Sequence, residues 1–270
     1  MKALKIAAIL PCLFLVSSVL WAATQYGEAV IERGSMTIIR EGRTLNFDQA
    51  NQAVPVNEQD LIRVRPDSLV QLKSRENATM TLGANAVFEV KPWQSHGRSG
   101  FLRALFGRFR AAVATLSGGQ QFNVKTATAT IGVKGTEYLT QVTSRGGTML
   151  VVTNHIVGFQ GQTGGESDVN QGFLALIINY RPPTKSAPLP EGFGDLFKDL
   201  GSPNPNTPGA GHFVGEHLLI QSGILTQDEL NELLNGGEGG EHGAGFVPAI
   251  NFDPNAAHDA SRLGTVKLQF

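Results

Sequence analysis

The chain has 270 residues, of which 41 % are hydrophobic and 17 % charged, with 32 glycines, 13 prolines and a single cysteine. This balance excludes a wholly disordered chain, a collagen, a coiled coil and a disulfide-stapled mini-protein. The formal net charge of −1 gives no overall sign of a nucleic-acid partner, and the length allows one large or two small domains with a buried core.

The N-terminus has the composition of a secretory signal. Lys2 and Lys5 precede an uncharged run over residues 6–23 that ends in small residues. We therefore expect residues 1–23 to be a signal peptide that exports the chain, which would make it periplasmic or secreted. The run is also long enough to stay as a membrane anchor, so cleavage and retention both remain open. Cleavage after Ala23 would remove Cys12, and with it any disulfide, thiolate nucleophile or cysteine-bound metal.

Residues 24–180 are expected to form a β-rich body. Short β-type runs, several with apolar and polar residues in alternation, are closed by Gly, Asn, Asp or Pro; examples are residues 68–72, 87–90, 122–126, 137–142 and 149–152. Alternation at period two gives each strand a core face, and frequent turns indicate a sandwich, a barrel or a β-solenoid. Residues 101–116 are the one helix candidate here, although Gly107 disfavours a long helix.

The remaining chain divides into three predicted parts. Residues 181–212 carry seven prolines among Gly, Ser and Asn, which is typical of a linker. Residues 213–236 predict a small α-hairpin, because Thr226 and Glu229 have the spacing of a capping box and Leu225 and Leu230 that of a hydrophobic staple. Residues 237–270 are expected to be a Gly-rich tail that ends in an alternating strand.

An ordered set of short motifs in the β body resembles a FecR-type domain. The set begins at residues 27–30, continues through residues 57–64, 68–72 and 86–90, and closes with a hairpin over residues 148–157. Its most specific segment, residues 122–138, is similar to a family pattern that runs from a strand through threonines and small residues to Val-basic-Gly-Thr-any-aromatic. The resemblance covers roughly residues 26–178 and implies a mainly β fold, a solenoid or roll of short strands, with a β-sandwich as the alternative.

The same resemblance implies a role without catalysis. FecR-like domains are exported β-rich modules, and their relatives in iron uptake relay a transporter's loaded state to a cytoplasmic sigma factor. Only five residues precede the apolar run here, so we expect a stand-alone exported form that acts as a binding or scaffolding module of the cell envelope. A periplasmic signalling partner that regulates a membrane protein in trans is the second hypothesis. The expected partner is an envelope protein or a glycan, not a nucleic acid.

The family-like segment contains a predicted turn at Lys134, Gly135 and Thr136. Gly135 permits a positive-φ turn between two strands, and the Thr136 hydroxyl is expected to bond back to the backbone there. The period-two spacing of Thr126, Thr128 and Thr130 predicts three hydroxyls on one face of a strand. A tightly packed strand-turn-strand of this kind needs no ligand.

One basic and aromatic segment is the candidate interaction patch, formed by Arg98, Phe101, Arg103, Arg108 and Arg110. Such a patch suits anionic lipid, a glycan or an acidic partner. The alternative is that its Phe and Leu residues are core while the arginines line the solvent face. The sequence has no Walker A loop, G-x-S-x-G elbow or H-E-x-x-H motif, so we expect no enzyme, no cofactor and no metal site.

Overall fold

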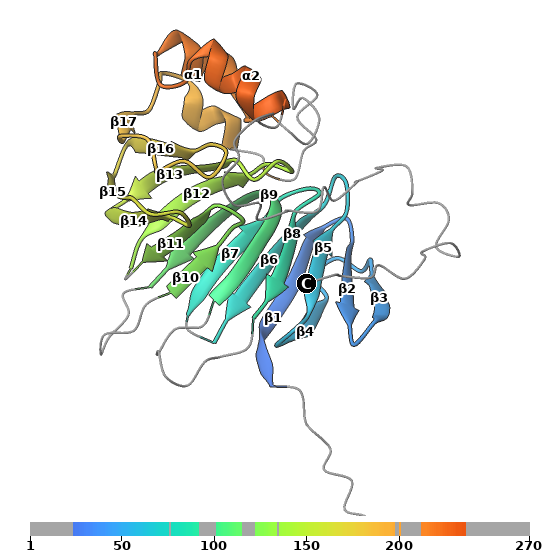
Figure 1. The fold of residues 1–270 in the computed structure, drawn as a ribbon. Helices are drawn as coiled ribbons and strands as arrows, with labels where there is room; N and C mark the ends of the chain where they lie inside the picture. Colours follow the sequence, from blue (N-terminus) through green and yellow to red (C-terminus); the bar gives the residue numbers. More distant parts are fainter. Residues whose placement is uncertain are drawn as a thin grey trace, which may run out of the picture.

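The structure, a computed structural model, describes residues 24–75, 77–91, 101–114, 122–133, 135–197, 200 and 212–235. In this part of the chain, seventeen strands form a two-layered roll, drawn in Figure 1. Sheet A has the strand order β4 (Ala53–Asn57), β1 (Gln25–Arg33), β6 (Leu69–Ser74), β7 (Ala78–Leu82), β9 (Phe101–Val113), β12 (Glu137–Val142), β13 (Thr148–Asn154), β16 (Phe173–Ile177) and β17 (Ala187–Pro188).

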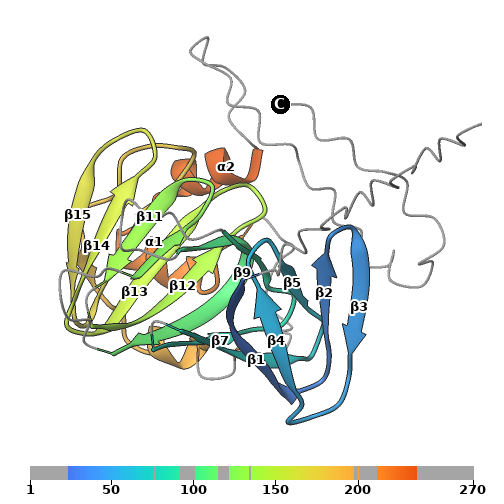
Figure 2. The same ribbon diagram turned by 90° about the horizontal axis from the view of Figure 1, so that it is seen from below.

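Sheet B has the order β3 (Arg43–Phe47), β2 (Met36–Arg40), β5 (Leu61–Val64), β8 (Val87–Val90), β9, β10 (Phe122–Lys125), β11 (Ala129–Val133), β14 (Ile156–Gly161) and β15 (Glu166–Asn170). All neighbours among these described strands are antiparallel except β9 and β10, which are parallel. The chain advances in the same direction through both sheets, so β3 and β15 lie at opposite ends of the roll (Figure 2). The expectation of a mainly β roll of short strands is confirmed.

The core lies between the two sheets and follows the period-two pattern of the sequence. Ile31 of sheet A and Ile38, Phe88 and Phe159 of sheet B are fully buried in one continuous cluster. Alternate residues on these strands point outward, as expected for sheets that bury one face. The ring of Phe109 packs edge-on against Phe88, with ring centroids 5.0 Å apart.

Strand β9 joins the sheets, which corrects the idea that residues 101–116 contain a helix. Its first half pairs with β8 and β10 in sheet B and buries Leu102, whereas its second half pairs with β7 and β12 in sheet A and buries Phe109. The crossing point is Gly107, at φ +107°, where a Cβ atom would lie 2.5 Å from the Ala86 Cα. Only glycine combines this backbone angle with so close an approach.

The C-terminal elements cover the outer face of sheet A and form a second apolar cluster. A 3₁₀ turn (Phe193–Phe197), α1 (Glu216–Gln221) and α2 (Gln227–Asn235) pack over β12, β13 and β16 (Figure 1). Gln141 fastens this cover: its amide donates to the His212 carbonyl at 2.9 Å and accepts from the Val214 amide at 2.7 Å. The α-hairpin therefore covers a sheet face and does not close an end of the roll.

The predicted helix signals in the hairpin are confirmed. The Thr226 hydroxyl accepts from the Glu229 amide at 3.1 Å, and the Glu229 carboxylate accepts from the Thr226 amide at 2.8 Å. Leu225 and Leu230 are buried beside this capping box, 1 % and 5 % exposed. The predicted tail over residues 237–270 lies outside the described residues.

Candidate functional site

The most family-like segment folds as the β10–β11 hairpin, with its turn at residues 126–128. This arrangement corrects the prediction of three threonines on one strand face: Thr126 and Thr128 turn into the interior, while Thr130 lies on the outer face of sheet B. The Thr126 hydroxyl accepts from the amides of Thr128 and Ala129, at 3.1 and 2.9 Å. The turn is thus built from side-chain hydrogen bonds in place of a regular ladder.

The buried hydroxyls form a directed chain that reaches the next hairpin. Thr148 lies 2.8 Å from Thr126 and 3.0 Å from Thr128, and the Thr128 hydroxyl donates to the Gly146 carbonyl at 2.6 Å. Each hydroxyl has a single proton, so the Thr128 proton is used at Gly146. Thr126 must then donate to Thr148, and Thr148 to Thr128. The threonines of this motif therefore hold two hairpins together and have a structural role.

Gly135 lies between β11 and β12 with the positive φ that the predicted turn requires, but Thr136 differs from the prediction. Gly135 has φ +136°, and Lys134 lies outside the described residues. Thr136 is 6 % exposed, but its hydroxyl forms no hydrogen bond within the described part of the chain. The expected bond back to the backbone is thus absent there, which leaves a buried hydroxyl with unused hydrogen-bonding capacity.

A second motif of the resemblance, at residues 57–60, contains Asp60, which forms an ion pair with Arg40 near one end of the roll. Asp60 is fully buried and accepts from both the Nε and the Nη2 of Arg40, at 2.8 and 2.7 Å, and from the Asn57 amide at 2.7 Å. The hydrogen bond with Asp60 raises the pKa of Arg40 above its ordinary value. Gln59, which precedes Asp60, has φ +72°, a conformation that favours glycine.

The predicted basic patch does not form one surface. Because β9 crosses from sheet B to sheet A at Gly107, Arg103 lies on the outer face of sheet B and Arg110 on the outer face of sheet A. Arg103 faces Glu89 at 3.6 Å and Arg110 pairs with Glu137, while Arg108 is 8 % exposed. Arg98 and the side chain of Phe101 lie outside what the structure describes. The alternative of arginines on solvent faces over an apolar core fits Arg103 and Arg110.

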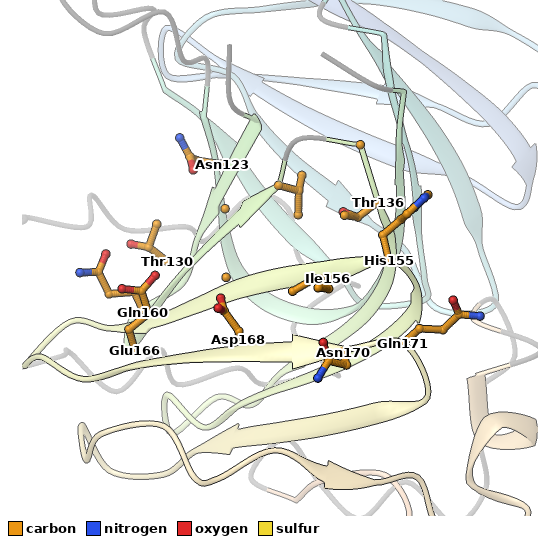
Figure 3. A pocket seen from close by; sticks show the side chains of 14 residues that line it. Asn123, Thr130, Thr136, His155, Ile156, Gln160, Glu166, Asp168, Asn170 and Gln171 are labelled. Atoms are coloured by element: carbon orange, nitrogen blue, oxygen red, sulfur yellow. The ribbon is translucent and has the colours of Figure 1, made fainter. Parts of the chain in front are cut away.

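A groove of about 1030 Å³, lined mainly by polar residues, opens on the outer face of sheet B, over β11, β14 and β15 (Figure 3). Two cross-strand rows form its floor. One row is Thr130, Gln160 and Glu166, and the other is Asn123, Gly132, Gly158 and Asp168. Figure 3 shows Thr130, Gln160 and Glu166 together at one end of the groove, with Thr136 and His155 by the loop at the other.

The rim of the groove carries a strained residue and an exposed apolar one. His155 has φ +64°, in the left-handed region that non-glycine residues rarely adopt. Ile156, next to it, is 56 % exposed and is the one large hydrophobic residue that stands out in this way among the described residues. A positive φ is shared by eight other non-glycine residues of the described chain, so the exposed Ile156 is the more distinctive feature of this rim.

The sequence pattern does not reveal this groove. Its lining comes from four strands and three loops between residues 123 and 171, and no local spacing brings them together. The alternation Glu166, Asp168, Asn170 was a usable signal, since it puts three polar side chains on one strand face. Within the described residues, no three His, Asp or Glu side chains are placed to hold a metal ion, and no helix has the length and apolar character needed to cross a membrane.

Comparison with known proteins relates part of the β body to a protein family. Residues 60–156 match the family model described as FecR protein. No curated protein matches the chain. Two crystal structures, at 2.50 and 1.65 Å, of a Parabacteroides distasonis protein provisionally described as an anti-sigma factor are similar at 15 % identity and a TM-score of 0.42. The similarity covers 47 % of this chain and 59 % of those chains, so this chain spans about three-fifths of their length.

The family match extends from the buried Asp60 to the groove residue Ile156 and includes the whole hydroxyl chain. FecR proteins are regulatory and are not known as enzymes, which supports a signalling-related protein of the FecR type. The β body of this chain therefore contains a FecR domain, as its motifs predicted.

Proposed function

We propose that this protein is an exported, non-catalytic FecR-domain module that binds a component of the bacterial cell envelope through the groove on sheet B. The observation that supports it most is a contrast between buried and outward-facing polar side chains. Thr126, Thr128, Thr148 and Asp60, all in the family-matched residues 60–156, are buried and hydrogen-bonded inside the protein, whereas most polar side chains of the groove face outward, including those of β15 beyond the match.

The two outer faces differ in a way that favours sheet B. On sheet A, the apolar residues of β12, β13 and β16 are covered by the 3₁₀ turn, α1 and α2. On sheet B, the groove over β11, β14 and β15 has no such cover among the described residues. A face that the chain covers itself is part of the fold, while an open concave polar face is available to a ligand.

Export rests on the N-terminal sequence and has its own test. Cell fractionation combined with the intact mass of the native protein would show whether the chain begins near Thr24 and where it resides. A periplasmic or extracellular chain that starts there supports export with cleavage. A cytoplasmic chain that keeps Met1 would overturn it.

Binding is tested by photo-crosslinking in the native host. A photoreactive residue at Asn170, on the groove, is compared with one at Lys73, an exposed position on the outer face of sheet A. We expect a discrete adduct from Asn170 and none from Lys73. Equal adducts from both positions, or no adduct from Asn170, would contradict a groove-specific partner.

The second candidate is a periplasmic signalling partner that regulates a membrane protein in trans. The FecR match favours it, because the family is regulatory. The same crosslink separates the two functions: an adduct with an inner-membrane protein supports signalling, and an adduct with a structural envelope component supports scaffolding.

A further inference from the structure

The described lining of the groove carries two carboxylates and no lysine or arginine. Glu166 and Asp168 lie two residues apart on β15 and are both exposed. Within the described residues, neither side chain forms an ion pair or a hydrogen bond. Two carboxylates free of partners beside neutral amides favour a ligand with positive charge.

Between these carboxylates and Asn123 lies a slot floored by two glycines. Gly132 and Gly158 are direct cross-strand neighbours, flanked by Asn123 and Asp168. Four adjacent strands make the slot about 14 Å long between the outer Cα atoms, at about 4.8 Å per strand. A lysine or arginine side chain can lie flat over this floor with its charged end at Asp168.

The glycine at position 158 is not required by the fold. A Cβ atom there would lie 3.7 Å from the Gly132 carbonyl oxygen and 3.8 Å from the Glu166 carboxylate, which are ordinary contacts, and φ is outside the left-handed region. A strand position that could hold a side chain but has none weakens the sheet slightly. The absence of a side chain at Gly158 keeps the floor of the groove open.

The exposed Ile156 lies at a distance from Gly158 that matches the repeat of an extended peptide. Ile156 precedes Gly158 by two residues on the same face of β14, so the two positions are about 6.7 Å apart. Residues i and i+2 of an extended peptide have the same spacing. The unused Thr136 hydroxyl lines the same groove and offers a hydrogen bond to a bound main chain.

We propose that the groove binds an extended segment of a partner protein in which an apolar residue and a lysine or arginine are two positions apart. The apolar residue packs on Ile156, and the basic residue lies over Gly158 with its charge at Asp168 and Glu166. This inference rests on the proposed function and names the chemistry of its ligand. A protein segment is favoured over a glycan because the exposed Ile156 and the free carboxylates suit an apolar and a basic side chain.

The test uses the fluorescently labelled peptide acetyl-Ser-Val-Thr-Lys-Ser-amide and the whole protein, by fluorescence anisotropy at low and moderate salt. We expect saturable binding that weakens with salt, and at least about tenfold weaker binding when Glu replaces the peptide's Lys. The Glu166→Gln, Asp168→Asn double variant should bind the basic peptide about tenfold more weakly. A control double variant, Asp48→Asn with Glu191→Gln, removes two exposed carboxylates elsewhere and should bind as the wild type does.

Gly158→Val is the most specific variant, since it fills the slot and its Cβ would make only ordinary contacts. It should unfold at the same urea concentration as the wild type or at a slightly higher one, yet lose peptide binding. Equal binding of the Lys and Glu peptides, unchanged binding by Gly158→Val, or tighter binding of chitotetraose than of the basic peptide would each overturn the proposal. If the peptide fails while Gly158→Val still abolishes the Asn170 crosslink in cells, the ligand class is wrong and the proposed function stands; if the crosslink is absent as well, both fall.

Discussion

The buried hydroxyl chain allows a quantitative prediction about Thr126 and Thr130 of the family-like segment and about Thr148 of the next hairpin. In Thr126→Val the shape of the side chain is kept, but the amides of Thr128 and Ala129 lose their acceptor and Thr148 loses its donor. Both amides are buried with the turn, and an unsatisfied buried donor costs about 1–3 kcal/mol. Allowing for relaxation of the turn, we expect Thr126→Val to lower the free energy of unfolding by about 3 kcal/mol.

Two further variants distinguish the loss of these amide hydrogen bonds from a general sensitivity of the hairpin to substitution. Thr148→Val interrupts the hydroxyl chain but leaves the amides bonded to Thr126, so its cost should be smaller, about 1–2 kcal/mol. Thr130→Val changes a threonine of the same segment that lies on the outer face, and should cost no more than about 0.5 kcal/mol.

The assay is equilibrium unfolding in urea followed by circular dichroism, with the slope checked for equality among the variants. The predicted order of destabilisation is Thr126→Val, then Thr148→Val, then Thr130→Val. The account of the turn would be refuted if Thr148→Val or Thr130→Val were as destabilising as Thr126→Val.

Three more substitutions test other positions, all by urea unfolding. Gln59→Gly should raise the free energy of unfolding by about 0.5–1 kcal/mol, because φ is +72° there; a loss of stability would contradict this. Gly107→Ala should lower it by at least about 2 kcal/mol, since the new Cβ would approach the Ala86 Cα; a neutral result would refute the crossing geometry. Burial raises the pKa of Tyr138 above its ordinary value of 10.0, so its phenol ionises only in the unfolded chain as the pH rises past 10. The buried Tyr138 hydroxyl has no hydrogen-bond partner among the described residues, so Tyr138→Phe should be neutral or stabilising by up to about 1 kcal/mol at pH 7. It should also lose less stability than the wild type above pH 10. A strong destabilisation at pH 7 would show that the hydroxyl has a partner.

Local patterns predicted the elements whose cause is local. The capping box at Thr226 and Glu229 and the staple at Leu225 and Leu230 depend on residues within one turn of helix, and both formed as predicted. The alternation in residues 87–90 and 122–126 likewise identified strands, because period two reports a buried face directly.

Features that depend on distant neighbours were missed or mispredicted. Period two in Thr126, Thr128 and Thr130 suggested one strand, but the hydroxyls of Thr126 and Thr128 find partners at Gly146 and Thr148, which no local pattern reveals. Gly107 was correctly seen to disfavour a long helix, yet its role as the point where a strand changes sheets comes from contact with Ala86. The groove also depends on residues that are distant in the sequence, since its two rows are formed by pairing of β10, β11, β14 and β15.

The measurement that tests the central claim most directly is the Asn170 photo-crosslink in cells, repeated with Gly158→Val in the same chain. Folding of the variant is checked by its urea midpoint. The account predicts a discrete adduct from Asn170 in the otherwise unchanged protein, its loss when the Gly158→Val substitution fills the slot, and no adduct from Lys73 in either case. An Asn170 adduct of equal yield with and without the filled slot would show that the groove on sheet B is not the binding site.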